Sequence, residues 1–509
     1  MKKIDELVNL TLKTCENWIK VDQNGLLCFI DPIDKKEISA HYGATHIATA
    51  FILLGNLRDD LPLLKKGKTL LLSVIKRWDT SKLLHSFHAD FNNFALCVAF
   101  DILKDIDSEL CNQIKEKVCS TSDSNHDTVN WLPMRWYVNI KRYEWTTDEK
   151  YKNIGEACRS KIKRATNKDG GIEDILPKGK SFNLQYDLAT VAVLQFMNCR
   201  GLEIDLSKEM GFLLNSVAPD GDINYQGRGT NQIFAWGMWL YLLSSSQDDL
   251  EIKKAISFLS NKVAIMLENN NLMLNNSKGQ EKHLWWDYHY SSVYTSHFLF
   301  WMVLSLVDFQ KKAIKTKTSE LNDSGVTIYR TANYFISTFN GRKKYLAETG
   351  PIISSFWMKK YGMINKGTFG PWLGMFGNKN TYGNVVLRNY IGLLKIKHNK
   401  NWSKNRIINR LLPNIESINY IKTIPIISKF KIKEDGNTII IKFDNSRKEK
   451  VVFNFPILDS IINIPEISLL ADGEPMMVVN NYKIKTQYGW CSIHQSKISS
   501  AKEWILRIK

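Results

Sequence analysis

The amino-acid sequence predicts an α+β multidomain protein in which an N-terminal (α/α) toroid of helical hairpins is followed by a C-terminal antiparallel β-sandwich. Its 509 residues exceed the roughly 250–300 at which a single hydrophobic core stops growing. Apolar residues recur every three or four positions up to about residue 315, and every second position after about residue 323. These periods indicate helices and then strands. We therefore expect a catalytic domain at 1–318 and a β domain at 323–509.

The N-terminal part combines helical periodicity with repeated turns. Asp169-Gly170-Gly171-Ile172 and Asp220-Gly221-Asp222-Ile223 are similar turns, each followed by a polar loop and another apolar helix. Hairpins of about 50 residues that cannot bury their own apolar faces must stack on one another. A superhelix or a closed toroid follows, with its polar loops gathered at one mouth. The expected helices lie near 43–56, 68–77, 92–104, 110–118, 131–144, 150–165, 183–198, 207–216, 230–245, 250–267 and 291–312.

The C-terminal part begins with an alternating segment from Gly325 to Phe339, which ends at the hairpin signal Asn340-Gly341. Short β-branched runs separated by turn residues follow it, and they predict an all-β layer. A sandwich is the architecture that we expect for it. The later runs are 385–397, 428–433, 437–444, 449–455, 475–479, 481–486, 489–494 and 503–508.

The net charge of +18 has two explanations. It fits an anionic partner, such as nucleic acid, a membrane surface or an acidic polysaccharide. It also fits an AT-rich genome that favours Lys and Ile. No basic stretch is interleaved with aromatic residues, and no helix-turn-helix or zinc-finger spacing occurs, so nucleic acid is not the expected partner.

The first 20 residues place Asp5, Glu6 and Asn9 where a signal peptide would need an apolar region. The most apolar stretches, such as 298–307, are shorter than the roughly 20 residues of a membrane span. The eight cysteines are scattered and form no CxxC pair, which is typical of reduced thiols. We expect a cytoplasmic protein with no membrane span.

Polar and aromatic residues gather at four predicted helix starts. Asn, Gln and Arg side chains match hydroxyls and carboxylates, and aromatic rings stack on the C–H faces of sugars. This mixture indicates a glycan site. The clusters are 130–137, 181–186, 224–232 and 285–292, and the secondary candidates are His41, Tyr42, His46 and the stretch 85–93. GxxxxGK[ST], GxGxxG, HExxH and GxSxG do not occur, and we expect no cofactor and no metal.

At these clusters the chain resembles the heparinase II/III-like and chondroitin AC/hyaluronate-lyase-like polysaccharide lyases, and related bacterial toroid proteins. Asn130-Trp131 resembles the Asn-Trp helix of those lyases. The segment from Ser181 to Tyr186 resembles their Gly-Ser-Phe…Gln-His/Tyr segment, with tyrosine where many have histidine. Tyr225 with Gly227-Arg228-Gly229 resembles their Tyr and Arg-Gly-Arg loop. The resemblance implies a toroid, a β-sandwich and β-elimination of a uronic-acid glycan.

Such an elimination removes the C5 proton of a uronic acid and expels the 4-linked sugar, so the neighbouring carboxylate must be neutralised. We expect Asn130, Arg228 and Asn231 to neutralise it. The base would be Tyr186 or His289. The acid would be Tyr225 or Tyr290. Further substrate-binding candidates are Trp131, Arg135, Gln185 and Trp286.

Simpler or rival explanations stay open. Trp131 and His297 have the spacing and surroundings of core residues. A hydrolase on the same toroid would use paired carboxylates such as Asp187, Asp222 or Asp287. A non-catalytic glycan-binding protein of surface-polysaccharide synthesis is a further alternative.

Overall fold

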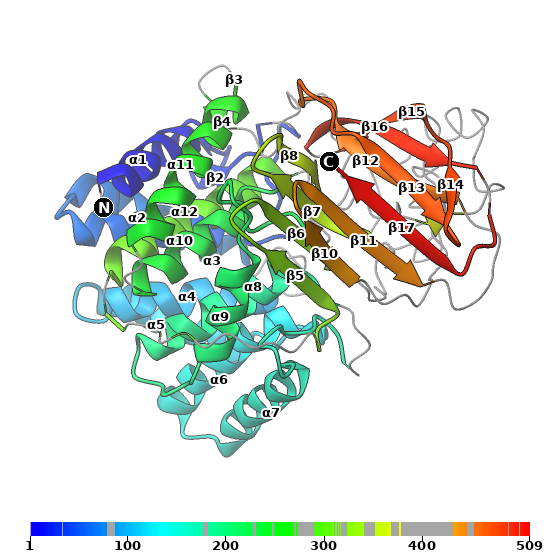
Figure 1. Ribbon diagram of the computed structural model, residues 1–509. Helices are drawn as coiled ribbons and strands as arrows, with labels where there is room; N and C mark the ends of the chain where they lie inside the picture. Colours follow the sequence, from blue (N-terminus) through cyan, green and yellow to red (C-terminus); the bar gives the residue numbers. More distant parts are fainter. Residues whose placement is uncertain are drawn as a thin grey trace, which may run out of the picture. The chain divides into compact units, whose positions relative to one another are not determined.

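The computed structural model divides the chain into two compact units (Figure 1). The helical unit comprises residues 1–178, 184–224 and 232–321, and the β unit comprises 179–183, 225–231 and 322–509. The structure describes residues 2–32, 34–78, 87–176, 182–227, 231–246, 249–268, 271–272, 290–309, 311–312, 314, 316, 323–339, 352–367, 376–377, 431–444, 452–486, 488–497 and 499–509.

The helical unit is built on a closed ring of inner helices. Each inner helix contacts the next one along the chain, and the last of them contacts the first. The ring is therefore closed, which selects the toroid over the open superhelix. The six inner helices are α2 (Gly43–Leu57), α4 (Ala89–Leu103), α6 (Leu132–Thr146), α8 (Leu184–Asn198), α10 (Phe234–Ser246) and α12 (Ser291–Val307).

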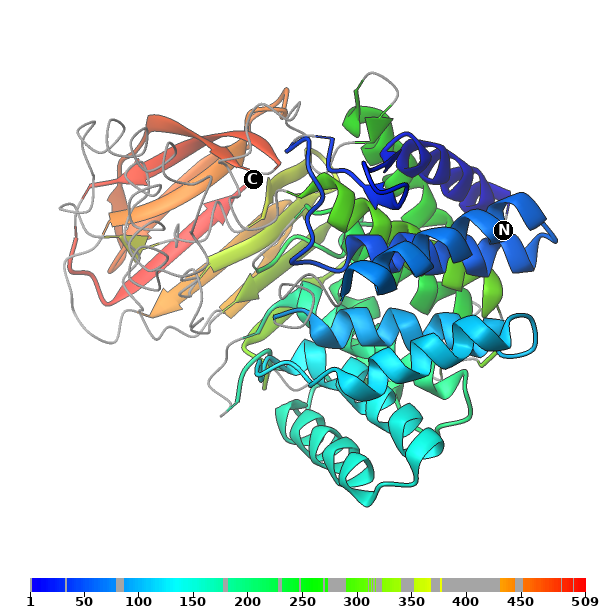
Figure 2. The same cartoon turned by 180° about the vertical axis from the view of Figure 1, so that it is seen from behind.

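An outer helix packs on each inner helix, so that the unit consists of helical hairpins (Figures 1 and 2). The two sets differ in sequence, because every residue of α8 is buried whereas α1 and α3 bury one face at three- and four-residue spacing. The outer helices are α1 (Lys2–Glu16), α3 (Leu61–Trp78), α5 (Ser108–Ser120), α7 (Glu149–Ala165), α9 (Ser207–Ser216) and α11 (Asp249–Met266).

Glycine permits the close contact of α2 with α3. A Cβ atom at Gly67 would lie 2.8 Å from the backbone N of Ile52, and one at Gly55 would lie 2.6 Å from the backbone N of Leu64. Any larger residue would force the two helices apart. Short elements complete the unit: β1 (Ile19–Val21) pairs with β2 (Leu27–Phe29), β3 (Leu267–Glu268) pairs with β4 (Asn271–Leu272), and η1 (Val129–Trp131) leads into α6.

The described strands of the β unit form antiparallel sheets. One is a meander of β5 (Val326–Arg330), β6 (Tyr334–Phe339), β7 (Ile352–Met358) and β8 (Gly362–Lys366). A second has the order β10 (Lys431–Asp435), β11 (Thr438–Asp444), β17 (Glu503–Ile508), β13 (Ile467–Ala471) and β14 (Glu474–Met476), and a third has the order β15 (Val478–Thr486), β16 (Gly489–Ser496), β12 (Val452–Leu458) and β9 (Phe376–Gly377).

Residues from all three sheets share one core, which includes Phe356, Phe453 and Trp504. The change from helical to strand structure falls between Val307, where α12 ends, and Val326, where β5 begins. The predicted strand 385–397 and the Asn340-Gly341 signal lie outside the described residues.

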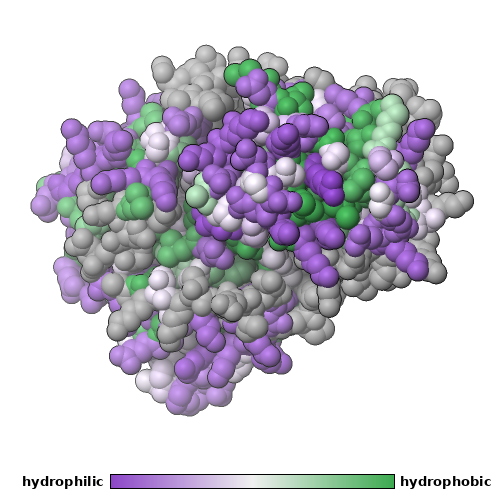
Figure 3. All heavy atoms as spheres, in the orientation of Figure 1, coloured by the Kyte–Doolittle hydropathy of each residue, from purple (hydrophilic) through white to green (hydrophobic). Residues whose placement is uncertain are grey.

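The coloured residues on the face in Figure 3 are mainly hydrophilic, as a solvated surface requires, with smaller apolar areas between them. Within the described ranges, no helix is both long enough and apolar enough to cross a membrane.

Candidate functional site

The inner helices begin at one end of the ring, which we call the mouth. Each outer helix runs back along its inner partner, so successive inner helices start at the same end. Contacts between aromatic rings at the N-termini of neighbouring inner helices demonstrate that these N-termini lie together. The His41 and His88 rings, which precede α2 and α4, are 4.1 Å apart, and Phe234 of α10 stacks on Tyr294 of α12 at 5.1 Å.

A row of rings, which we call the ring strip, follows the mouth. Its centroids are 4.9 Å apart from Tyr290 to His41, 5.5 Å from His88 to Trp131 and 5.0 Å from Trp131 to His126. The imidazoles and Tyr290 are partly exposed, while Trp131 is 8% exposed. The strip therefore offers a partly accessible aromatic surface made by residues that begin four different helices or lie in the loops before them.

Hydrogen bonds fix the imidazole orientations in the ring strip. His88 donates from Nδ1 to the Ala40 carbonyl at 2.9 Å, which leaves Nε2 as the acceptor of the neutral ring. Burial and, to a smaller extent, nearby His126 lower the pKa of His88 to about 4, against the opposing effect of the bond to Ala40. The Nδ1 atom of His126 lies 2.9 Å from the Thr128 hydroxyl. Near neutral pH, His88 is thus an uncharged hydrogen-bond acceptor.

Asn130 lies beside the ring strip, in η1 and directly before Trp131. Its side chain is 7% exposed, and its buried Oδ1 has no hydrogen-bond partner among the described residues. A buried polar atom left without a partner costs about 1–3 kcal/mol. Such atoms are uncommon in native proteins, and a bound water or ligand is one explanation for them.

Arg135 has a different environment from the one that a substrate-binding role requires. Its Nε and Nη2 donate to Asp90 Oδ2 at 3.2 and 2.9 Å, and Nη2 also donates to the carbonyls of Ser124 and His126 at 2.7 and 2.6 Å. The pair is buried, because the Arg135 and Asp90 side chains are 9% and 0% exposed. Arg135 therefore holds the loop that carries His126, which is a positioning role. The substrate-binding role expected for Arg135 stays a prediction.

A second layer of rings lies below the ring strip, along the axis of the helical ring. Tyr42 stacks on Phe91 at 4.4 Å and lies 5.4 Å from the His297 ring. Burial raises the pKa of Tyr42, and Tyr186 raises it further. Tyr42 therefore remains a protonated phenol at neutral pH.

Two buried histidines, His46 and His297, form the next layer, with ring centroids 5.0 Å apart. The Nδ1 atom of His46 donates to the Tyr42 carbonyl, and the Nε2 atom of His297 accepts a hydrogen bond from Trp301. His297 is thus buried in the core, as its sequence context predicts. Burial lowers the pKa of both rings, that of His46 to about 3.

The pKa of His46 predicts a pH-dependent stability. In the unfolded chain the His46 imidazole has a pKa near 6.5 and binds a proton below that pH, whereas in the folded protein it stays neutral. The contribution of His46 to the free energy of unfolding is therefore complete above pH 6.5 and is lost as pH falls. Between pH 6.5 and 5 this loss is about 2 kcal/mol. We expect His46→Phe to reduce the fall in unfolding free energy over this range by that amount, as measured by urea denaturation. Parallel pH dependences in the wild type and His46→Phe would contradict it.

The structure brings Asn130, Trp131, Tyr186 and Tyr290 to the mouth of the helical unit. Gln185 lies beside Tyr186 in the first turn of α8 and is 1% exposed. The sequence-based selection missed His126 and gave His41 and His88 only secondary rank. His126 precedes the 130–137 cluster by a few residues, so widening that cluster toward the N-terminus would have included it.

The remaining site candidates belong to the β unit or are outside the described residues. Tyr225 and Asn231 belong to the β unit. Tyr225 is fully buried, with its ring 6.3 Å from that of Phe335, and Asn231 is 2% exposed with a left-handed φ of 61°. Arg228, Trp286 and His289 lie outside the described residues.

The carboxylates considered for a hydrolase are held by backbone groups. Asp187 accepts from the Ile172 N–H at 3.1 Å, and Asp222 accepts from the Asn224 N–H at 2.7 Å. Both are fully buried, and Asp287 lies outside the described residues. Across the described ranges, no group of three or more His, Cys, Asp or Glu side chains could hold a metal ion.

No protein-family model matches the sequence, and no curated protein sequence matches it. Among solved structures, the chain is similar to the α-1,6-mannanase GH76A of Salegentibacter sp. HEL1_6, with 12% identity over 60% of this chain and 99% of that one and a TM-score of 0.42. It is similar to a polysaccharide lyase, with 13% identity, 59% and 96% coverage and a TM-score of 0.40. It is also similar to a mutant form of the unsaturated glucuronyl hydrolase of Streptococcus agalactiae, with 12% identity, 60% and 90% coverage and a TM-score of 0.39. At TM-scores below 0.5, these likenesses do not bear on what this chain does.

Proposed function

We propose that the helical unit binds an acidic polysaccharide or oligosaccharide at its mouth and cleaves it as a lyase, by β-elimination at a uronic acid. The observation that carries this proposal is the position of Asn130 beside the ring strip. Its side chain is a buried carboxamide, and the oxygen of that group has no partner among the described residues. A sugar hydroxyl bound there would supply the missing hydrogen bond by donating to Oδ1. In the proposed organisation, residues 1–318 form the catalytic domain and 323–509 a β-sandwich.

The ring strip supports a sugar ligand. Trp131 and Tyr290 are separated along the strip by the His41 and His88 rings, which are spaced at 4.1–5.5 Å from their neighbours. Flat rings suit the apolar C–H faces of pyranoses, while imidazole and amide groups bind their hydroxyls. A row of such rings can accommodate more than one sugar residue of a chain.

The convergence of helix starts supports an acidic sugar. Helix N-termini carry partial positive charge from their unpaired N–H groups. Six inner helices begin at the mouth, and the chain carries a net charge of +18. A uronate carboxylate placed near Asn130 would therefore meet a favourable potential before any side-chain cation is counted.

The proton-transfer groups at the mouth support elimination. Tyr186 is the proposed base and Tyr290 the proposed acid. In the reaction, the base takes the C5 proton, the C5–H electrons form the C4–C5 double bond, and the bond from C4 to the leaving oxygen breaks. The acid then protonates that oxygen. Tyr225, Arg228, Asn231 and His289 remain proposed contributors.

A hydrolase is the less favoured alternative, because Asp187 and Asp222 are buried and bonded to backbone groups, and Asp90 is paired with Arg135. Inverting or retaining hydrolysis needs two carboxyl groups facing the scissile bond. A glycan-binding protein without catalysis is the other alternative, and it would use the same ring strip.

Incubation of the purified protein with a panel of uronic-acid glycans tests these functions. A lyase is expected to generate both the ultraviolet absorbance of a 4,5-unsaturated uronate and new reducing ends. Reducing ends without the absorbance would identify a hydrolase. Binding by calorimetry without either signal would leave a glycan-binding protein, and the absence of binding would reject the proposal.

A further inference from the structure

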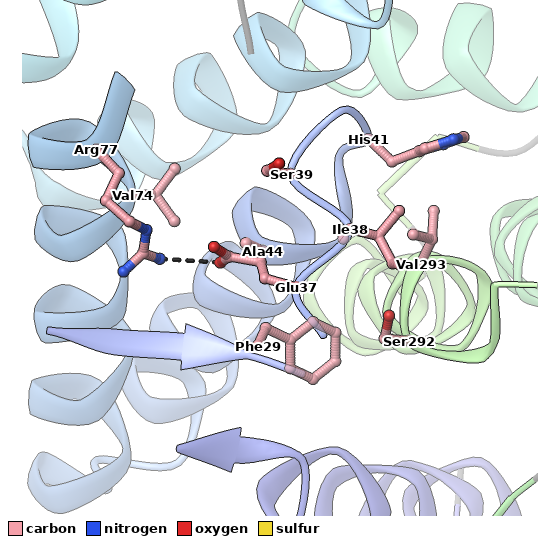
Figure 4. Close-up of a pocket in the computed structure, with 11 residues that line it drawn as sticks. Phe29, Glu37, Ile38, Ser39, His41, Ala44, Val74, Arg77, Ser292 and Val293 are labelled. Carbon is pink, nitrogen blue, oxygen red and sulfur yellow. Dashed lines mark hydrogen bonds and ion pairs between the residues drawn. The ribbon is translucent and has the colours of Figure 1, made fainter. Parts of the chain in front are cut away.

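A small pocket lies at the mouth end of the helical unit (Figure 4). It is bounded by the first turns of α2 and α12, the loop before α2, the last turn of α3 and strand β2. His41 belongs to the pocket lining and also to the ring strip, where it lies 4.9 Å from Tyr290. A ligand on the strip can therefore extend a substituent into the pocket.

The pocket is built to a fixed shape. Gly43 lets α2 approach α12, since a Cβ there would lie 3.1 Å from the Val293 Cα. The start of α12 is anchored because the backbone N–H and hydroxyl of Ser292 donate to Asp31 at 2.8 and 2.9 Å. At the other side, Arg77 bonds to Glu37 at 3.0 Å, the contact drawn in Figure 4.

The volume of the pocket is about 40 Å³, which is room for about three water molecules at roughly 10–15 Å³ each. A group of three heavy atoms has this size. Phe29, Ile38 and Val293 supply apolar walls, and the Ser39 hydroxyl supplies a hydrogen-bond donor. Burial raises the pKa of Glu37, although Arg77 opposes this effect.

We propose that this pocket receives an acetyl group, as an ester or an amide, carried by a sugar bound on the ring strip. The methyl group would contact the apolar walls, and the carbonyl oxygen would accept from Ser39. A bare hydroxyl would leave the apolar walls uncovered. The inference rests on the proposed function and adds a selection for acetylated glycans.

Methyl NMR tests the pocket without any glycan. Methyl acetate and acetamide, the ester and amide probes, are expected to shift the Ile38 and Val293 methyl signals. Ala44, in the first turn of α2, also lines the pocket. Ala44→Leu, which fills the pocket, should abolish these shifts, whereas Ala44→Ser, which hardly changes its volume, should retain them. Unshifted signals in the folded wild type would overturn the inference.

Titration with O-acetylated, N-acetylated and deacetylated forms of one uronic-acid oligosaccharide tests the biological consequence. We expect at least one acetylated form to bind about tenfold more tightly than the deacetylated form, and Ala44→Leu to remove this preference without weakening the deacetylated ligand. A preference that persists in folded Ala44→Leu would overturn the inference. Probe binding without any glycan binding would support the acetyl pocket and reject the proposed function.

Discussion

Replacing Asn130 with alanine is expected to lower turnover of a uronic-acid glycan by about 100- to 1,000-fold, the effect of removing one preorganised hydrogen-bonding group from a site where charge develops. The free energy of unfolding should fall by no more than about 1 kcal/mol. The reason is that the buried Oδ1 has no partner to lose among the described residues. Turnover is measured by the ultraviolet absorbance of the unsaturated product, and stability by urea denaturation.

Asn139→Ala is the matched control for this prediction. Asn139 is a fully buried asparagine two turns further along α6, and its Nδ2 donates to Asp123 at 3.1 Å and to the Arg135 carbonyl at 2.9 Å. Its replacement should cost about 1–3 kcal/mol of stability with little change in turnover of the folded protein. If the two variants exchanged these effects, Asn130 would be a structural residue and the proposed site would lose its main support.

The second large effect is expected for Arg135→Ala, which should lower the free energy of unfolding by about 3–5 kcal/mol. The substitution leaves Asp90 buried without its cation and releases the carbonyls of Ser124 and His126. Burial already raises the pKa of Asp90 to about 6 against the opposing effect of Arg135, so the isolated carboxylate would be costly. Urea denaturation followed by tryptophan fluorescence measures the loss.

Two further variants distinguish this positioning role from substrate binding. Arg159, on α7, is 60% exposed and pairs with Glu156 at 3.6 Å, so Arg159→Ala should change stability by less than about 1 kcal/mol. The double variant Asp90→Leu with Arg135→Met should recover much of the stability, because it removes both buried charges together. An Arg135→Ala protein that melts like the wild type but no longer binds the glycan would restore the substrate-binding role predicted from the sequence.

The sequence by itself determined the local features of the helical part. Apolar residues at three- and four-residue spacing predicted α8, α10 and α12, and the polar residues at their starts directed attention to Asn130, Tyr186 and Tyr290. Both signals are local, because a helix start and an apolar face are encoded within a few turns of the chain.

Only the tertiary structure decided which groups meet. Closure of the ring brings α12 against α2, and Arg135 pairs with Asp90 across 45 residues. Neither pairing can be derived from periodicity, which shows that a face must be covered but not what covers it. Two asparagines therefore differ in their hydrogen bonds. The Asn139 side chain donates to Asp123 and to the carbonyl of Arg135 on its own helix. The Oδ1 atom of Asn130 has no partner among the described residues and can accept a hydrogen bond from a ligand. The function proposed for the mouth depends on this difference, which arises from long-range packing and hydrogen bonding.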